Sequence, residues 1–256
     1  MTFARSRSIR LAAAIALATA LSACSTGPRG PSDTVIARAL QGAPGEAQPS
    51  NVVATEIAYA RTAREDGWGA AANAFATPAA VIHGRNGPVP FAVIARDPGD
   101  ATATSEWGPR VVVISCDGAL ALSQGRFRDP EGLVGDYVTV WERQRDNSYR
   151  WSYDVAGLDN PQPAPRPEPA EGDIVVTALD AVNGLVASCP DDGAAVPPPP
   201  ALESPSLTAE ISRDGTLRWA WEHLADDRKR VLADYYHEGE WVRAIAETLA
   251  SPDEAE

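Results

Sequence analysis

The side chains of this chain that could carry out chemistry are three histidines, three cysteines and a scatter of carboxylates. His83, His223 and His237 stand far apart, and none has a cysteine or a second histidine at the spacing of a metal site. His223 and His237 could be cross-strand neighbours, but no third ligand accompanies them. The sequence also has no GxSxG, GxGxxG, HExxH or P-loop motif. We therefore expect neither a bound metal nor a cofactor.

The carboxylates offer no obvious acid–base pair. Glu65 and Asp66 adjoin at the end of a predicted helix, where neighbouring residues do not face one another. Asp136 and Asp154 lie on predicted strands outside any known active motif. They could face inward, but we favour an orientation toward solvent.

The first 23 residues have the pattern of an export signal. Basic residues precede Leu11 to Leu21, an apolar run of 11 residues that is too short to span a bilayer. The run leads into Leu21-Ser22-Ala23-Cys24, which resembles the bacterial lipoprotein signal, in which the cysteine becomes the lipid-modified first residue. The resemblance implies that Cys24 anchors the chain in the cell envelope, facing the periplasm. Ser25 stands where retained inner-membrane lipoproteins commonly have Asp, which favours the outer membrane. The alternative is an ordinary signal peptide with a chance cysteine.

The two remaining cysteines are candidates for a disulfide. An exported chain meets an oxidising compartment, and an even pair of cysteines there favours a bridge. Cys116 ends a predicted strand, and Cys189 ends a strand-like run beyond a Pro-rich linker. We expect the two to pair and to clip the linker-borne segment to the first sheet.

The composition excludes some partners. The chain of 256 residues has a formal charge of −13, from 35 Asp and Glu against 22 Lys and Arg. A protein this acidic does not bind nucleic acid or anionic lipid headgroups electrostatically. The length allows one large domain, or one domain with an appendage.

Four consecutive strands dominate the pattern. They are Arg110 to Cys116, Ala119 to Gly125, Gly135 to Arg143 and Tyr149 to Val155. Asp117-Gly118 predicts a type I′ hairpin turn, and Asp146-Asn147 marks another turn. Alternation predicts that Tyr149, Trp151 and Tyr153 share one face of an antiparallel meander.

Helices are predicted before the meander. One helix begins at Ser50 or Asn51, which could cap it, and ends at Asp66 before Gly67. A second runs from Trp68 to Ala76, a short strand follows at Ala79 to His83, and Gly87 to Arg96 holds a brief third helix or an extended segment. Residues 24–50 read as a flexible tether. Helices followed by a meander predict an α+β fold.

Three passages in residues 51–157 resemble the nuclear-transport-factor-2-like superfamily, which includes SnoaL-like proteins and ketosteroid isomerase. They are Ala60-Arg-Thr-Ala-Arg-Glu-Asp-Gly-Trp68, Ala74-Phe-Ala-Thr-Pro-Ala-Ala-Val-Ile82 and the hairpin from Gly135 to Trp151. The resemblance implies a cone-shaped curved antiparallel sheet wrapped on N-terminal helices. Within this superfamily, the passages resemble a SnoaL-like domain of unknown function that is found in exported bacterial proteins.

The C-terminal part lies outside this resemblance. Residues 158–172 form a Pro-rich linker, residues 173–250 an all-β appendage, and residues 251–256 an acidic tail. Its second meander comprises Leu207 to Ser212, Thr216 to His223, Arg230 to His237 and Trp241 to Thr248. Because four strands alone have little core, we expect this sheet to pack on the first domain, with residues 173–189 joining one of the sheets.

The resemblance also implies site residues. His83 falls on the position of the ketosteroid isomerase base, whereas Ala60 falls on that of its oxyanion-hole tyrosine. Alternation sends Tyr137, Thr139 and Trp141 to one side of their strand. Aromatic residues are the candidate lining of a ligand pocket: Tyr59, Trp107, Tyr137 and Trp141.

Three functional hypotheses remain open. The favoured one is an envelope lipoprotein whose SnoaL-like domain binds a small apolar ligand or a protein partner without catalysis. The second is an enzyme of the ketosteroid isomerase or dehydratase kind with His83 as general base, and the third is a structural module that forms a homodimer. A roomy pocket in which polar groups converge would favour an enzyme, an apolar one binding, and a filled one a structural role.

Overall fold

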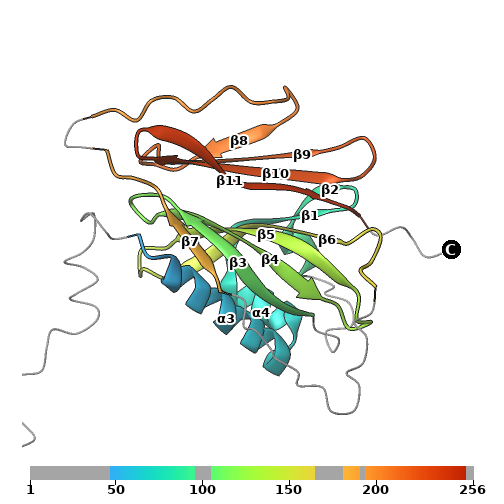
Figure 1. Cartoon of the computed structure of the whole chain (residues 1–256). Helices are drawn as coiled ribbons and strands as arrows, with labels where there is room; N and C mark the ends of the chain where they lie inside the picture. The colour runs from blue at the N-terminus through green and yellow to red at the C-terminus, as the bar shows by residue number, and fades with distance from the viewer. Residues whose placement is uncertain (1–46, 96–104, 165–180, 191–193, 252–256) are drawn as a thin grey trace, which may run out of the picture. The chain divides into compact units, whose positions relative to one another are not determined.

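The computed structural model describes residues 47–95, 105–164, 181–190 and 194–251 of the chain (Figure 1). The predicted signal segment with Cys24, residues 173–180 of the predicted all-β appendage and residues 252–256 lie outside the described residues. Within the described part, helices and two β-sheets make an α+β fold, as the sequence predicts. None of the described helices is long and apolar enough to cross a membrane.

Three helices precede the meander: α3 (Pro49–Asp66), α4 (Trp68–Phe75) and α5 (Phe91–Ile94). Helix α3 includes Pro49, and neither Ser50 nor Asn51 caps it, because proline is already set for the first helical turn, where its missing N–H is not needed. Its end is as predicted: Gly67 has a φ of 88°, and its N–H donates to the Ala63 carbonyl at 3.0 Å. Gly67 then leads directly into α4.

The larger sheet has the order β2-β1-β6-β5-β4-β3-β7. Its strands are β1 (Ala76–Gly84), β2 (Gly87–Pro90), β3 (Glu106–Ile114), β4 (Leu120–Arg128), β5 (Val134–Arg143), β6 (Tyr149–Leu158) and β7 (Asn183–Val186). Strands β3 to β6 form the predicted antiparallel meander. Strand β1 runs parallel to β6, and β7 joins the other edge parallel to β3. Residues 87–90 pair with β1, and the brief helix α5 follows directly after Pro90, which is one of the two predicted alternatives for Gly87 to Arg96.

The turn after β3 differs from the prediction. A type I′ turn needs positive φ at both central residues, but of these two only Gly118 has one, at 67°. The turn is wider: the Gly118 N–H donates to the Ser115 carbonyl at 2.9 Å. The Asp117 carboxylate accepts hydrogen bonds from the Ser115 hydroxyl and the Ala119 N–H, at 2.7 and 2.9 Å. These side-chain bonds hold Asp117 in its turn, an outcome that the Asp-Gly pair alone does not specify.

A β-bulge in β6 changes which side chains share a face. Trp141 pairs with Trp151, but the preceding Val140 pairs with Tyr153, so Ser152 has no partner on β5. Trp151 therefore packs on the helix side of the sheet and Tyr153 on the other side. The prediction of one aromatic face on this strand is wrong, because an extra residue inverts the alternation beyond it.

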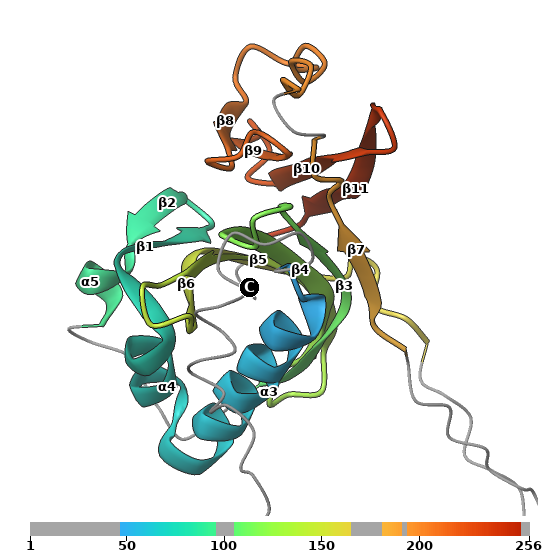
Figure 2. The same cartoon turned by 90° about the vertical axis from the view of Figure 1, so that its left-hand side faces the viewer.

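The two faces of the larger sheet bury two cores. Helices α3 and α4 cover one face (Figure 2). The core there includes Val52, Ala63, Ala72, Val112, Ile114, Trp141 and Trp151. The core on the opposite face joins residues of both sheets, among them Val113, Leu122, Val138, Tyr153, Leu217, Trp219, Val231 and Tyr235. The C-terminal sheet thus packs on the first one.

The smaller sheet has the order β11-β10-β9-β8. Its strands are β8 (Thr208–Ile211), β9 (Leu217–His223), β10 (Lys229–His237) and β11 (Glu240–Leu249), close to the predicted second meander. Its β8–β9 turn repeats the β3–β4 turn: the Asp214 carboxylate accepts from the Ser212 hydroxyl and the Thr216 N–H. The sequence reading missed this repetition of Ile-Ser-x-Asp-Gly-x-Leu at 114–120 and 211–217.

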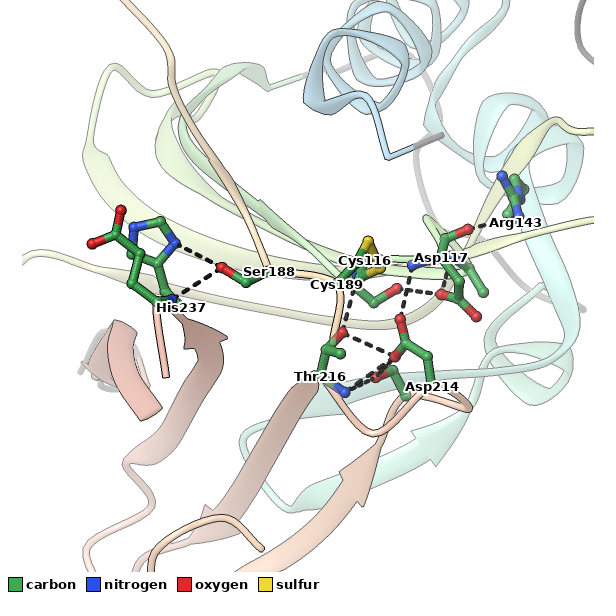
Figure 3. The surroundings of a disulfide bond; sticks show 12 residues. Cys116, Asp117, Arg143, Ser188, Cys189, Asp214, Thr216 and His237 are labelled. Carbon is green, nitrogen blue, oxygen red and sulfur yellow. Dashed lines mark hydrogen bonds between the residues drawn. A yellow bond between two sulfur atoms is a disulfide. The ribbon is translucent and has the colours of Figure 1, made fainter. Parts of the chain in front are cut away.

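The two repeated turns meet beside the disulfide (Figure 3). Cys116 and Cys189 are bonded, with their Cα atoms 5.1 Å apart, as predicted. The Cys116 N–H donates to the Thr216 hydroxyl at 3.0 Å, and the Asp117 N–H donates to the Asp214 carboxylate at 2.8 Å. The bridge and these hydrogen bonds together fix β7 and the smaller sheet to the end of β3.

A candidate ligand cavity on the helix side of the larger sheet

A cavity of about 160 Å³ lies on the helix side of the larger sheet and is partly open. Its walls are Tyr59, Trp68, Ser105, Trp107, Phe127, Tyr137, Thr139, Asp154 and Ala156. Helix α3 supplies Tyr59, whereas the sheet supplies residues from β3, β4, β5 and β6. Tyr137 with Thr139, and Asp154 with Ala156, come two apart along a strand and so face the same side.

Aromatic rings make up most of the wall. The ring centroids of Tyr59 and Trp107 are 5.0 Å apart with planes at 70°, an edge-to-face corner. Phe75 packs on Tyr59 from outside the cavity, at 5.3 Å. Burial raises the pKa of the Tyr59 phenol far above its usual value. The corner is therefore held from several directions.

Asp154 is the charged group in this wall. Its Oδ1 accepts a hydrogen bond from the Thr139 hydroxyl at 2.6 Å. The residue keeps some accessible surface where it borders the cavity, yet it lies deep enough that burial raises its carboxyl pKa to about 6. In the described part of the chain no Lys or Arg forms an ion pair with it. The expectation that Asp154 faces solvent is wrong, because the bulge at Ser152 turns it inward.

A second carboxyl stands behind the wall. Glu56 of α3 is 1% exposed, and its Oε1 accepts a hydrogen bond from the Tyr137 hydroxyl. Its Oε2 has no hydrogen-bond partner among the described residues. Burial raises the pKa of Glu56 to about 7, against the lowering effect of its hydrogen bond with Tyr137. The sequence analysis did not single out Glu56. The only sign that it lies inward is that its i−4, i−3 and i+3 neighbours, Val52, Val53 and Tyr59, are apolar.

Gly125 makes room for the tyrosine. It pairs with Tyr137 across β4 and β5, and a Cβ added there would lie 2.6 Å from the Tyr137 hydroxyl and 2.2 Å from the Gly108 carbonyl oxygen. Any side chain at this position would displace the hydroxyl from Glu56. A glycine within a strand often marks such a close approach.

His83 does not belong to this cavity. It is 2% exposed, and its Nδ1 lies 2.6 Å from the Tyr153 hydroxyl while its Nε2 lies 3.1 Å from Nδ1 of His223. Burial, then the neighbouring His223 and Lys229, lower its pKa to about 4. Ile82 pairs with Asp154, so the next residue along β1 points to the other face, toward the smaller sheet. His83, the base in the alternative enzymatic hypothesis, therefore lies outside this cavity.

Three of the four residues predicted to line a ligand pocket do line the cavity, and the fourth lies behind its wall. Tyr59, Trp107 and Tyr137 line the cavity. Trp141 has no exposed surface; its indole N–H donates to Ser123 at 2.9 Å, and its ring packs on Tyr59 at 6.4 Å. Trp141 thus supports the wall from within the core.

The two C-terminal histidines do not pair. In the register of β9 and β10, His223 lies opposite Lys229, at the far end of β10 from His237. His237 Nδ1 instead lies 3.5 Å from the Ser188 hydroxyl. No group of three His, Cys, Asp or Glu that could hold a metal occurs among the residues that the structure describes.

Comparison with known proteins adds little to this geometry. No protein-family model matches the chain, and no curated protein matches it. A solved nuclear transport factor 2 (NTF2-like) superfamily protein from Salmonella enterica serovar Typhimurium LT2 is similar, at 11% identity, over 49% of this chain and 96% of that chain. Its TM-score is 0.35, and a likeness of that size determines neither fold nor function.

Proposed function

We propose that this protein is an envelope lipoprotein whose NTF2-like domain binds a small, largely apolar ligand in the cavity between α3 and the larger sheet. The observation that carries the proposal is the cavity, an aromatic-walled space of about 160 Å³ in which Thr139, Tyr137 and Asp154 provide polar groups. Mostly apolar walls with a few convergent polar groups are the usual form of a ligand site.

The cavity's size restricts the ligand. An engineered apolar cavity of about 150 Å³ holds a benzene molecule. The present cavity of about 160 Å³ therefore suits a ligand of roughly six to eight non-hydrogen atoms. A steroid is far larger, so the substrates of ketosteroid isomerase do not fit this space.

A purely structural role explains the cavity less well. Protein interiors are close-packed, and a void beside a carboxyl group lowers stability without a compensating contact. Asp154, with its raised pKa, is such a group. Shifted carboxyl groups of this kind gather at functional sites.

The envelope location rests on the sequence before the fold. The apolar run that ends at Cys24 supports export and lipid attachment. The disulfide of Cys116 and Cys189 fits an oxidising compartment. We accordingly propose that the cavity faces the periplasm, where small solutes reach it directly.

A blocking variant tests the binding proposal. Ala156 lines the cavity, so Ala156→Phe should fill much of its space. Ala209→Phe on β8 makes the same change at an exposed position away from it. Benzene-sized probes titrated against the ¹⁵N-labelled protein should shift resonances of Tyr59 and Trp107 in the parent and in Ala209→Phe, and should leave Ala156→Phe unchanged. Equal shifts in all three proteins would place binding elsewhere.

A second function is favoured by one specific arrangement. Asp154, with a pKa of about 6, shares the cavity wall with the Tyr137 hydroxyl, which is hydrogen-bonded to the buried Glu56. Proton abstraction next to a carbonyl requires a base, such as this carboxylate, and a donor for the developing oxyanion. The Tyr137 hydroxyl can be that donor when Glu56, whose pKa is about 7, is protonated and donates to the Tyr137 oxygen instead of accepting from it. The candidate base is thus Asp154. Deuterium exchange into small ketones such as acetone or cyclopentanone, followed by NMR, should be faster than in buffer and should be lost in Asp154→Asn if the protein catalyses this step.

A further inference from the structure

We propose that the natural ligand of the cavity is a small organic cation, of the methylated-ammonium class. The inference rests on the proposed function, since it names the chemical class that the same cavity takes. Two independent features of the cavity carry it: aromatic walls, and a carboxylate that forms no ion pair with any Lys or Arg among the described residues.

The aromatic walls favour positive charge. Ring faces are electrically negative, and a cation within about 6 Å of a ring centroid is attracted to it, most strongly by Trp. Five of the wall residues are aromatic: Tyr59, Trp68, Trp107, Phe127 and Tyr137. Tyr59 and Trp107 meet at 70°, so that their rings form a corner rather than a stack. Cages of this composition recognise quaternary ammonium groups.

The carboxylate supplies the charge that a cation needs. Thr139 is its hydrogen-bond donor, and none of the described wall residues is Lys or Arg. A buried charge without a partner is costly, so a ligand that brings the opposite charge gains most at this position. The neighbouring groups add no positive charge: Glu56 and Tyr59 on α3 and Tyr137 on β5 are acids. An anionic ligand would meet the Asp154 carboxylate, with Glu56 close behind the wall, and is disfavoured by both.

Size and donor type decide between kinds of cation. A metal ion such as Ca²⁺ takes six to eight oxygen ligands, whereas the described wall offers one carboxylate and a few hydroxyls. A methylated ammonium group needs no dehydrated oxygen shell and presents methyl groups to the rings. With about seven non-hydrogen atoms, a compound such as choline matches a cavity of about 160 Å³. The protein's net charge of −13 raises the local concentration of any cation.

A matched pair of probes tests the class of ligand. Choline and 3,3-dimethyl-1-butanol have the same shape, but the second has a neutral carbon in place of the quaternary nitrogen. Isothermal titration of the full chain in non-ionic detergent at pH 8 should give choline an affinity about tenfold or more higher than the neutral compound. In Asp154→Asn this preference should fall to about threefold or less, and in Glu142→Gln, which removes an exposed carboxylate on β5, it should persist.

A second variant guards against a folding defect, and pH adds a further readout. Trp107→Leu removes an aromatic wall and should weaken choline more than the alcohol. Choline binding to the parent protein should weaken as pH falls below about 6, because the Asp154 proton must leave first. Binding of the alcohol should not follow this dependence.

The outcomes separate the two claims. If the alcohol binds as tightly as choline, the cavity is a ligand site but the cation inference is wrong. If Asp154→Asn keeps the tenfold preference, Asp154 does not supply the charge and the inference also fails. If neither probe binds while benzene-sized neutral probes do, the inference again fails alone. If no probe of any class binds, the proposed function fails with it.

Discussion

Asp154→Asn should make the protein more stable at neutral pH. In the parent, burial raises the carboxyl pKa of Asp154 from 3.8 to about 6. Because the pKa of this carboxyl is higher in the folded than in the unfolded state, its ionisation destabilises the folded state. The folded parent therefore keeps its full stability below about pH 4 and loses stability as pH rises through about 6. At about 1.36 kcal/mol per pKa unit, the difference between 3.8 and about 6 corresponds to at most ~3 kcal/mol. Since Asp154 borders a partly open cavity, solvent should reduce the effect to about 1–2 kcal/mol.

The assay is urea unfolding at pH 4 and pH 7.5, with the slope m checked for constancy. The asparagine can still accept the Thr139 hydrogen bond, so the variant and the parent should be alike at pH 4. At pH 7.5 the variant should unfold at the higher urea concentration. The other groups near this carboxyl are Glu56, Tyr59, Tyr137 and Tyr153, and only Glu56 titrates in this range. A variant that is less stable at pH 7.5, or shifted equally at both pH values, would refute the account of a buried, unpaired carboxylate.

Three further predictions follow from other parts of the chain. Cys24→Ala should release the protein from the membrane fraction or leave its precursor uncleaved, since stable attachment needs the acyl chains; unchanged fractionation would contradict a lipid anchor. Thiol labelling of the unfolded, unreduced protein should find no free thiol at Cys116 or Cys189, and two labelled thiols would show that the bridge is absent. Because the two cysteines are 73 positions apart, reduction of the bridge should lower the free energy of unfolding by roughly 4 kcal/mol. Gly125→Ala should destabilise the protein by about 2 kcal/mol or more in thermal unfolding, because the added Cβ would overlap the Gly108 carbonyl. Gly108→Ala, whose added Cβ meets open space, should change the stability by no more than about 0.5 kcal/mol. Equal effects of the two substitutions would disprove the close approach at Gly125.

The meander was predictable because local patterns specify it. Alternation and turn residues place β3 to β6 within a few residues of their observed bounds. The disulfide was predicted from two cysteines in a chain whose first residues resemble an export signal. In both cases the deciding information lies within one strand, one turn or one residue type.

The site was less predictable because its geometry depends on contacts between distant residues. The bulge at Ser152 decides that Asp154 faces the cavity and that Tyr153 faces the smaller sheet. A serine within a strand does not by itself indicate that it has no partner on the neighbouring strand. Glu56 lies in an ordinary helical stretch, and its partner Tyr137 is 81 positions away. The resemblance to ketosteroid isomerase matched His83 to the position of a base. A match of sequence passages does not specify the register of β1 against β6, which decides the face that His83 lies on.

The central claim is that the cavity under α3 binds a small ligand, and a crystal structure of the protein equilibrated with choline tests it most directly. The account predicts density for the ligand among Tyr59, Trp107 and Phe127, with the quaternary nitrogen nearest the Asp154 carboxylate. A cavity without density for choline and also without density for benzene in a second, benzene-soaked crystal would contradict it.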